Sequence, residues 1–520
     1  MNSSSSEEPH VILFLRHLTR KIAGGSRSVL DRAAMFVEAG YRVTLVVLEF
    51  NPRPGEAIDE LRRDRILHPG VDILGYWSLF DTPERMIAAS YHVRKWPFVD
   101  PATYDTCTRE MNGDNLARRD YYLKDVLTRT ERWSKGRPSL CEMFDLSGNL
   151  TERWRFDRNG KLFSIDEFGG EANVALSRTL FVNGAIKLAR IDLRLPLGRG
   201  AVDGEGIAAG STWASVVAGE MDRIFADVRK LIVIADGENV SQTILREMRH
   251  PGIVGISVLH NNHLDSPYAS DAPTKPLWVP FLEDVRNIDY MVCLTERQKH
   301  DLLTRYPDQP AVVIHHAVLP PPPIKIKRHP FRVVFVGRLS HQKQLDHLLA
   351  VFQRVHRTLP QSQLWVYGDG TERDSFKEKI RTLNLVDAVT MNGFTIDPLS
   401  AFASGALTLM TSHYEGLPLT LGEAMSVGTP FVAYDLNYGP AEMIENGKNG
   451  ILITAGDIDA MAQAVVALLT DSRRLAEMSA AARTVVDTFN RDRNRENWLK
   501  LIAGAHNPQL SGAKASLGLT

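Results

Sequence analysis

The 520-residue sequence is poor in cysteine, carries almost no net charge and lacks a long apolar run. Its three cysteines (Cys107, Cys141 and Cys293) form no C-x-x-C pair, which argues for a reducing compartment and against structural zinc. A formal net charge of −1 gives no support for nucleic-acid binding. No run of about 18 apolar residues is present, and the polar start MNSSSSEEPH lacks an apolar signal core. We therefore expect a cytoplasmic protein without a transmembrane segment, at most peripherally associated with a membrane.

Recognisable hydrolase, nucleotide-loop and metal motifs are missing as well. The sequence has no G-x-S-x-G or Walker loop and no His/Glu cluster with metal-ligand spacing. Asp457 and Asp459 form a D-x-D pair, but the apolar pattern AMAQAVVALL follows them directly. This position favours a helix N-cap over a metal ligand. We expect no metal and no other cofactor.

The patterns that are present divide the chain into two α/β units and a β-rich insertion. A chain of this length is too long for one hydrophobic core. The opening run HVILFL, a Gly-rich loop, a helical pattern and a second apolar run predict a βαβ beginning, and such alternation returns from about residue 206 and again after residue 330. In between, period-2 alternation broken by Ser-Gly, Asn-Gly and Gly-Gly turns predicts antiparallel hairpins. The stretch RKWPFVDPATYDTCTREMNG within this part is ambiguous.

Two doubly wound domains follow from this division. Four consecutive prolines and a basic stretch mark a stiff linker. The predicted parts are an N-terminal Rossmann-like domain of residues 1–74 and 205–319, a β-rich insertion of residues 75–204 for acceptor binding or oligomerisation, a linker of residues 320–330, a C-terminal Rossmann-like domain of residues 331–503 and a disordered tail of residues 504–520. The natural site for a ligand lies at the carboxyl ends of the parallel strands.

Glu415 and Glu423, eight positions apart in SHYEGLPLTLGEAMSVGTP, are the most informative pair. The preceding ASGALTLMTS predicts a buried strand and LTLGEAM the start of a helix, which places Glu415 on the connecting loop and Glu423 inside the helix. The backbone N–H groups of residues 416–420 would then lie at the positive end of the helix, where a phosphate binds. The two carboxylates can accept hydrogen bonds from sugar hydroxyls. A nucleotide sugar has all of these parts.

Arg338 and Lys343 follow the first strand of the second domain, ahead of a helix, in VGRLSHQKQLDHLL. A departing diphosphate develops negative charge, and two fixed cations beside it lower the barrier electrostatically. Solvated surface cations are the alternative interpretation of this pair taken alone. Gly337 before the arginine and the two glutamates downstream favour the functional interpretation.

Glycines mark further loops at the same edge. Gly24 and Gly25 follow the first strand, where a missing Cβ lets backbone approach a phosphate or a sugar. Gly368 ends a later strand in YGDG, although a plain turn explains it equally well. Phe394 and Thr395, in VTMNGFTID, follow the next strand, and core packing is an alternative for the phenylalanine.

These motifs together resemble the retaining glycosyltransferases of the GT-B type, family 4 in particular, which carry R-x4-K and E-x7-E. The resemblance covers the first and last units. It implies that Arg338, Lys343 and the amides of Gly416, Leu417, Leu419 and Thr420 around Pro418 hold the diphosphate, that Glu415 holds the sugar hydroxyls and that Glu423 holds the ribose. It also implies that Gly337 and Gly368 line the donor site and that the loop of Phe394 and Thr395 lies against the nucleobase.

Similar enzymes carry a histidine near the donor sugar where this chain has His260-Asn261-Asn262-His263. We expect His260 to take that role and regard His263 as a weaker candidate. Gly439, Pro440 and Glu442 resemble a segment that closes the donor side of the site, with a structural role equally open. The resemblance implies no enzyme nucleophile: the acceptor attacks the face that the diphosphate leaves, and closure of the two lobes about the linker excludes water.

The insertion narrows the resemblance. With its FVNG and GGEANV segments it looks like the group of bacterial wall-teichoic-acid α-glycosyltransferases and of adhesin-glycosylating transferases. The implied donor is UDP-glucose or UDP-N-acetylglucosamine, and the implied acceptor is a polyol-phosphate polymer or a protein serine or threonine. The exposed hairpin edges of the insertion leave room for a homo-oligomer.

Other functions for the same architecture stay open. A UDP-sugar 2-epimerase shares the two lobes, but it needs extra acid/base carboxylates and no acceptor module. A non-catalytic glycosyltransferase-like partner keeps the fold and loses donor residues, whereas Arg338, Lys343, Glu415 and Glu423 are all present here. A glycan phosphorylase would need a pyridoxal-phosphate lysine site, for which the sequence gives no sign.

Overall fold

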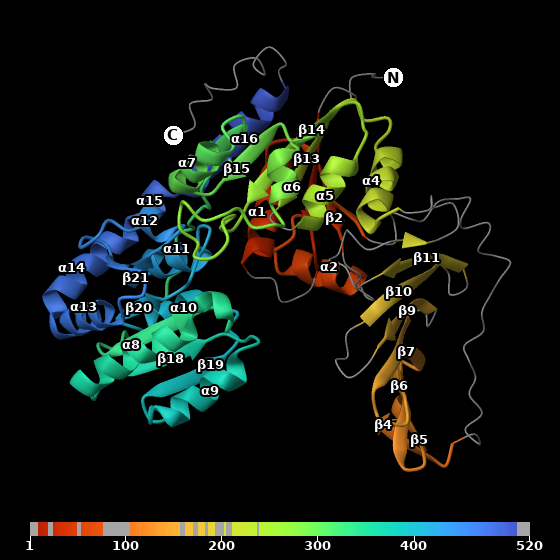
Figure 1. Cartoon of the computed structure of the whole chain (residues 1–520), viewed down its shortest axis with the longest axis horizontal. Coiled ribbons are helices and arrows are strands. Elements are labelled where there is room, and N and C mark those ends of the chain that lie inside the picture. Colours follow the sequence, from red (N-terminus) through yellow and green to blue (C-terminus); the bar gives the residue numbers. More distant parts are fainter. Residues whose placement is uncertain are drawn as a thin grey trace. The chain divides into compact units, whose positions relative to one another are not determined.

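The computed structural model describes residues 9–18, 24–48, 54–75, 104–113, 115–156, 162–169, 175–182, 186–192, 202–203, 211–236 and 239–506. Figure 1 labels its elements. Contacts group the described chain into two compact units, one within residues 1–22 and 29–255 and the other within residues 23–28 and 256–520. The predicted tail beyond residue 506 and most of the ambiguous stretch before Tyr104 lie outside the described residues.

The first sheet is a parallel one with the order β16-β15-β14-β13-β1-β2-β3. Its strands are buried apolar runs, as expected for parallel strands covered by helices on their faces. The strands are β1 (His10–Leu15), β2 (Arg42–Val47), β3 (Val71–Leu74), β13 (Leu231–Asp236), β14 (Ile253–Leu259), β15 (Tyr290–Cys293) and β16 (Ala311–Val313). The helices among them are α1 (Gly25–Glu38), α2 (Pro54–Arg63), α4 (Trp213–Ile224), α5 (Asn239–Glu247), α6 (Val279–Glu283) and α7 (Glu296–Arg305).

The second sheet is an antiparallel meander in which each strand pairs with the next along the chain, in the order β12 to β4. This confirms the predicted β-rich insertion. Its strands are β4 (Thr106–Asn112), β5 (Asn115–Leu123), β6 (Val126–Ser134), β7 (Arg137–Phe144), β8 (Leu150–Phe156), β9 (Leu162–Phe168), β10 (Ala175–Val182), β11 (Ile186–Asp192) and β12 (Val202–Asp203).

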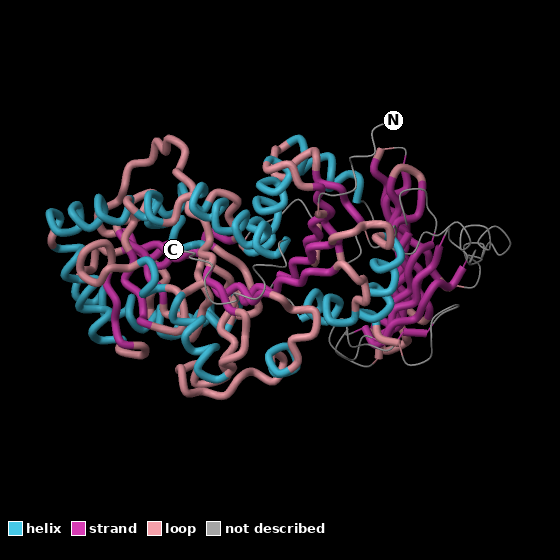
Figure 2. The backbone as a smooth tube through the Cα atoms, turned by 90° about the horizontal axis from the view of Figure 1, so that it is seen from above, coloured by secondary structure: helices cyan, strands magenta, loops and turns pink. Residues whose placement is uncertain are grey.

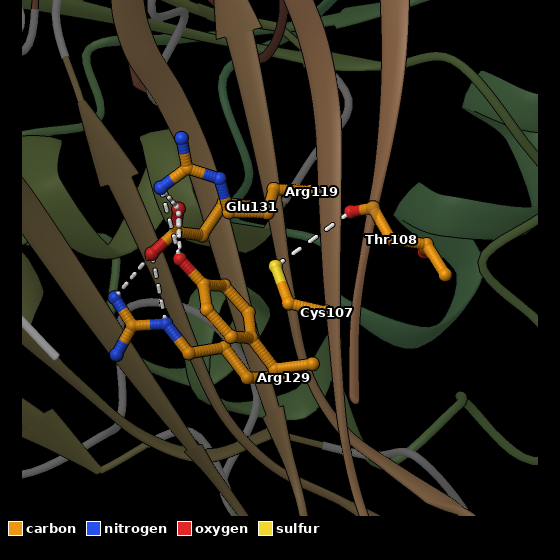
Figure 3. Close-up of polar contacts among 6 residues, drawn as sticks. Cys107, Thr108, Arg119, Arg129 and Glu131 are labelled. Carbon is orange, nitrogen blue, oxygen red and sulfur yellow. Dashed lines mark hydrogen bonds and ion pairs between the residues drawn. The ribbon is translucent and has the colours of Figure 1, made fainter. Parts of the chain in front are cut away.

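Buried charge within this meander is paired across and along its strands. The buried Glu131 carboxylate accepts hydrogen bonds from the Arg129 guanidinium (2.6 Å) and from the Tyr121 hydroxyl (3.2 Å), and the Arg119 guanidinium lies 4.0 Å away. Figure 3 shows Arg119 and Arg129 directed at Glu131 from either side. Such pairing is what allows charged groups to be buried in a sheet. The cluster therefore has a structural explanation.

The third sheet is parallel and has the order β19-β18-β17-β20-β21-β22. Its parallel strands (magenta) are accompanied by helices (cyan) in Figure 2. The strands are β17 (Arg332–Val336), β18 (Gln363–Tyr367), β19 (Val389–Gly393), β20 (Leu407–Met410), β21 (Phe431–Asp435) and β22 (Ile451–Thr454). The helices are the 3-10 turn η2 (His341–Lys343), α8 (Leu345–Thr358), α9 (Arg373–Thr382), α10 (Pro398–Ala403), α11 (Leu419–Ser426), α12 (Pro440–Met443), α13 (Ile458–Thr470), α14 (Ser472–Arg483), α15 (Val485–Thr488) and α16 (Arg491–His506).

The core of this third sheet is closed by α8 and α13. In α8 the apolar residues Leu345, Leu348, Leu349 and Phe352 recur at helical spacing, so one stripe of the helix is buried. It packs with α13 against the strands in one hydrophobic cluster. Helix α16 runs to His506, three residues past the predicted end of this domain, and its residues Leu501 and Ile502 are buried.

The predicted linker, residues 320–330, has no regular structure, but one end of it is fixed. The Arg328 guanidinium donates to the carbonyl oxygens of Gly428 (2.7 Å) and Val427 (3.1 Å) and to the hydroxyls of Ser479 (2.8 Å) and Thr429 (3.2 Å). Any hinge in this segment must therefore lie before Arg328.

Candidate functional site

The third sheet places two site loops next to each other. Strand order reverses direction between β17 and β20, so the loops that follow these adjacent strands diverge and leave room at their carboxyl ends. Ligands of open α/β sheets bind at such a switch point. The loop after β17 carries Arg338 and Lys343, and the loop after β20 carries Glu415. The predicted placing of Glu415 on a loop and of Glu423 in a helix is confirmed.

Lys343 and Glu415 form the central ion pair of this site. The Lys343 Nζ lies 2.6 Å from the Glu415 Oε1, and both side chains are largely buried. Gln342 adds a second link, since its Nε2 donates to the Tyr414 carbonyl (3.0 Å) and to the Glu415 Oε2 (3.3 Å). Both carboxylate oxygens of Glu415 are therefore held in place.

Arg338 lies exposed beside this pair. Its guanidinium makes no hydrogen bond or ion pair with any residue of the described chain, so its donors remain available. It lies close enough to Tyr414 to oppose the rise in the pKa of that phenol, which burial causes and the neighbouring Tyr268 and Glu415 reinforce. The loop after β17 thus offers one paired and one unpaired cation.

The start of α11 presents bare backbone donors. The N–H groups of Gly416, Leu417, Leu419 and Thr420 have no partner among the described residues, and the helix carries no side-chain cap. Pro418 has no N–H, so four donors, rather than five, can face an anion. These donors lie at the positive end of the helix dipole.

Close backbone contacts fix this segment. A Cβ on Gly416 would lie 2.1 Å from the His260 carbonyl oxygen, and a Cβ on Gly439 would lie 2.5 Å from the Pro418 Cδ and 2.8 Å from the Gly416 oxygen. Gly439 also has a φ of +109°, which an L side chain rarely adopts. The structure therefore brings His260, the α11 start and Gly439 together, and it needs glycine at both positions.

Glu423 differs from Glu415 in its surroundings. Its carboxylate makes no hydrogen bond or ion pair with another described residue, and burial raises its pKa to about 7. A half-buried carboxylate without a partner is costly unless a ligand supplies hydrogen-bond donors. Glu423 is accordingly suited to bind hydroxyl groups.

The remaining predicted residues lie on neighbouring loops. A Cβ on Gly368 would meet the Gly337 oxygen at 1.8 Å, so these two turns touch, and the Gly368 N–H donates to the Gly393 carbonyl (2.7 Å). Phe394, next to Gly393, is 47% exposed, which rules out the alternative that it is a core residue. The Thr395 hydroxyl accepts from the Asp397 N–H (3.0 Å) within its own turn.

Gly24 and Gly25 present open backbone. A Cβ at either position would meet no atom within 4 Å, and Gly24 has a φ of +59°. No contact printed for them joins the loops of β17 and β20 in the described chain. His260 follows β14 and stacks on His316 with ring centres 5.5 Å apart. His263, in contrast, is fully buried and stacks on Tyr438, so a direct role for it at the donor is not supported.

Sequence reasoning missed residues that join these loops. Gln342 lies inside the R-x4-K segment but matches no motif position. Asn262, quoted only as a neighbour of His260, donates through Nδ2 to the Asn437 carbonyl (2.9 Å), which also accepts from the Glu415 N–H (3.2 Å). No sequence signal identifies such a partner, because the contact joins positions 175 residues apart.

Glu442 and the D-x-D pair have local explanations. The Glu442 Oε1 accepts from the Glu296 N–H (3.2 Å) and lies 2.6 Å from the His315 Nε2. The Asp457 side chain caps α13 by accepting from the Ala460 N–H, so the predicted N-cap is confirmed. Within the described ranges no group of three or more His, Cys, Asp or Glu side chains could hold a metal ion.

Residues 321–485 match the family model described as Glycosyl transferases group 1. This segment includes Arg338, Lys343, Glu415 and Glu423, and it is a glycosyltransferase group 1 domain. It accounts for the third sheet, and the rest of the chain lies outside the match. No helix of the described residues is both long and apolar enough to cross a membrane.

Curated relatives resemble about half of the chain. The chain is 27% identical over 276 residues to the poly(glycerol-phosphate) alpha-glucosyltransferase of Bacillus subtilis (strain 168), and 28% identical over 289 residues to the poly(ribitol-phosphate) alpha-N-acetylglucosaminyltransferase of Staphylococcus aureus (strain COL). The matches cover 52% and 54% of this chain, and 40% and 57% of those proteins. The matched region thus spans about half the length of these relatives.

Solved structures resemble nearly the whole chain. The crystal structure of S. aureus TarM in complex with fondaparinux, alpha-GlcNAc-glycerol and UDP has a TM-score of 0.75 at 20% identity, and covers 95% of this chain and 99% of that one. The pneumococcal O-GlcNAc transferase GtfA in complex with UDP and GlcNAc has a TM-score of 0.69 at 19% identity, and covers 96% and 99%. The chain has the GT-B fold with a β-rich insertion, and that prediction is confirmed.

Proposed function

We propose that this chain is a retaining glycosyltransferase that moves a hexose, glucose or N-acetylglucosamine, from a UDP-sugar to an acceptor hydroxyl. The Lys343–Glu415 pair at the switch point carries the proposal, with the unpaired Arg338 and the bare donors of α11 around it. Two cations and four N–H groups match a diphosphate, and two carboxylates match the hydroxyls of a sugar and a ribose. The group 1 domain match and the UDP-bound structures of similar fold support the same donor class.

The residues divide the work by charge. Arg338, Lys343 and the α11 amides would stabilise the negative charge that develops on the leaving diphosphate, and fixed donors of this kind supply a large share of catalysis. Glu415 would hold the sugar hydroxyls and Glu423 the ribose hydroxyls. His260 would contact the sugar from the loop after β14. No metal is needed in this scheme, because the two side-chain cations supply the positive charge.

The reaction breaks one bond and forms one. The acceptor oxygen bonds to the anomeric carbon on the face from which the diphosphate departs, and the bond from that carbon to the phosphate oxygen breaks. The acceptor proton passes to the departing phosphate oxygen, so UDP leaves and the anomeric configuration is retained. Glu415 then acts on position and charge and forms no covalent bond.

The acceptor is proposed from the chain's relatives. Two of them are named for poly(glycerol-phosphate) and poly(ribitol-phosphate), and a third, from Streptococcus gordonii, is the GtfA subunit of a peptide N-acetylglucosaminyltransferase that is 28% identical over 292 residues. We propose a cell-wall polyol-phosphate polymer or a protein serine or threonine as acceptor.

UDP release from a panel of nucleotide sugars tests the donor. We expect slow hydrolysis of one UDP-sugar by the wild type, reduced about 100-fold by Glu415→Ala and by Arg338→Ala, the size of effect seen when one charge-stabilising group is removed. Arg473→Ala, on the exposed face of α14, is the matched control and should leave the rate unchanged.

The other outcomes have distinct meanings. UDP binding without release from any donor would indicate an enzyme that needs its acceptor, and an acceptor screen would begin with polyol-phosphate polymers. Neither UDP release nor UDP binding would overturn the proposal and favour the non-catalytic partner.

A further inference from the structure

Asn262 is a buried polar junction on the loop that follows β14. Its side chain is fully buried and uses its amide completely. The Nδ2 donates to the carbonyls of Asn437 (2.9 Å) and Tyr268 (3.3 Å), and the Oδ1 accepts from the Leu264 N–H (2.7 Å). An asparagine satisfied in this way holds its loop in one conformation.

The junction connects directly to the backbone of Glu415. The Asn437 carbonyl that Asn262 binds also accepts from the Glu415 N–H (3.2 Å), and the Tyr438 N–H donates to the Glu415 carbonyl (3.0 Å). His260 and Asn262 lie two positions apart on one loop. The position of Glu415 relative to His260 therefore depends on this hydrogen-bonded connection.

Lys275 makes a second connection between the same two loops. Its Nζ donates to the Asn262 carbonyl (2.7 Å) and lies 4.0 Å from the ring centre of Tyr414, the residue before Glu415. The same ammonium lies 5.4 Å from the ring of Tyr268, and the two tyrosine rings are 4.4 Å apart. An ammonium at these distances is attracted to the aromatic faces.

We propose that Lys275 is a positioning residue of the donor site, whose positive charge holds Tyr414, and through it Glu415, against the Asn262 loop. The inference rests on the proposed function, because it concerns how the sugar-binding carboxylate is placed. A neutral amine could still donate to the Asn262 carbonyl, but it would lose the attraction to the two rings. The charge, and not merely the volume, of the side chain is what matters.

The charge on Lys275 is poised to change within the working pH range. Burial lowers the pKa of Lys275 to about 8, and Asp265 opposes the shift. The fraction of charged lysine therefore falls as the pH rises through about 8. The titratable and charged groups that face Lys275, directly or through Tyr414, are Asp265, His263, Tyr268, Tyr414, Glu415 and Arg338.

The test is the pH profile of UDP release between pH 6.5 and 9.5 with the donor found for the wild type. We expect the wild-type rate to fall through about pH 8 by about 3- to 30-fold, the range of a partly buried cation–π contact. Lys275→Met should be slow and flat at the level that the wild type reaches at high pH. Lys275→Arg, which stays charged, should keep its rate at pH 9.5.

Lys377→Met, on the exposed face of α9, is the matched control and should keep the wild-type profile. A fall near pH 8 that persists in Lys275→Met would overturn the inference. Should the methionine variant fail to fold, Lys275→Arg decides alone: a wild-type fall near pH 8 in that variant overturns it equally. A wild type that neither releases nor binds UDP at any pH would count against the proposed function instead.

Discussion

Glu415 and Glu423 have the same side chain eight positions apart, and the structure gives them opposite surroundings. Glu415 is neutralised by Lys343 and fixed by Gln342. Glu423 has no partner in the described chain and a pKa raised to about 7 by burial. A paired carboxylate is positioned before a ligand arrives, whereas an unpaired one gains its hydrogen bonds only from the ligand.

The raised pKa of Glu423 predicts a stability effect with a definite sign. Between the unfolded value of 4.5 and the folded value of about 7, the folded protein binds more protons than the unfolded chain. The free energy of unfolding therefore falls as the pH rises through this window. Glu423→Gln cannot ionise, so we expect the variant to be more stable than the wild type at pH 8, on the order of 2 kcal/mol, and equally stable near pH 5.

Thermal melts of both proteins at pH 5 and pH 8 measure this difference. Glu477→Gln, on an exposed face of α14, serves as control and should shift neither melt. A variant with the wild-type melting temperature at pH 8 would contradict the buried, unpaired carboxylate. The same variant should bind UDP more weakly than the wild type.

Helix α11 is the element on which the site depends, and its two ends are treated differently. The N-terminal N–H groups have no partner in the described structure, while the C-terminal carbonyls of Val427 and Gly428 accept hydrogen bonds from Arg328, and Arg483 also donates to Val427 (3.3 Å). Cations at the C-terminus of a helix are favourable. Burial, with Arg483 nearby, lowers the pKa of Arg328 to about 10, which still leaves the guanidinium charged at neutral pH.

Removing Arg328 should loosen α11 and its diphosphate-binding end. Arg328→Ala leaves two buried carbonyls with fewer donors, and we expect a loss of about 2 to 4 kcal/mol in the free energy of unfolding. Chemical denaturation measures it, with Lys327→Ala on the exposed part of the linker as the control. A variant as stable as the wild type would show that Arg328 does not anchor α11.

Element types were largely predictable, and element ends were not. Apolar runs and period-2 alternation predicted the parallel strands and the meander, because side-chain periodicity follows directly from backbone geometry. The end of α16 at His506 was predicted three residues early, since burial of Leu501 and Ile502 and not a cap signal keeps that helix packed. Strand order within each sheet depends on packing, which no local pattern encodes.

The whole molecule divides into two compact units, and the candidate donor residues lie in one of them. Arg338, Lys343, Glu415, Glu423 and His260 all belong to the unit within residues 256–520. A ligand that binds only the folded form stabilises the part that it contacts. At 100 times its dissociation constant UDP should add about 2.7 kcal/mol to that unit.

Hydrogen exchange with and without UDP measures this at the scale of the molecule. We expect protection in peptides from 332–343 and 411–426 and little change in the meander strands of residues 106–192. Protection confined to the meander would contradict the assigned donor site. Arg338→Ala should reduce the protection of both peptides, and Arg473→Ala should not.

The sequence by itself determined which residues carry the chemistry and on which element each lies. R-x4-K and E-x7-E are local spacings, and strand, loop and helix follow from local periodicity, so Arg338, Lys343, Glu415 and Glu423 could be named in advance. Only the tertiary structure decided which of them meet. Lys343 pairs with Glu415 across 72 positions because the order of parallel strands makes β17 and β20 neighbours. The junction of Asn262, Lys275, Tyr414 and Asn437, and the raised pKa of Glu423, arise from long-range packing and burial, which spacing along a chain does not specify.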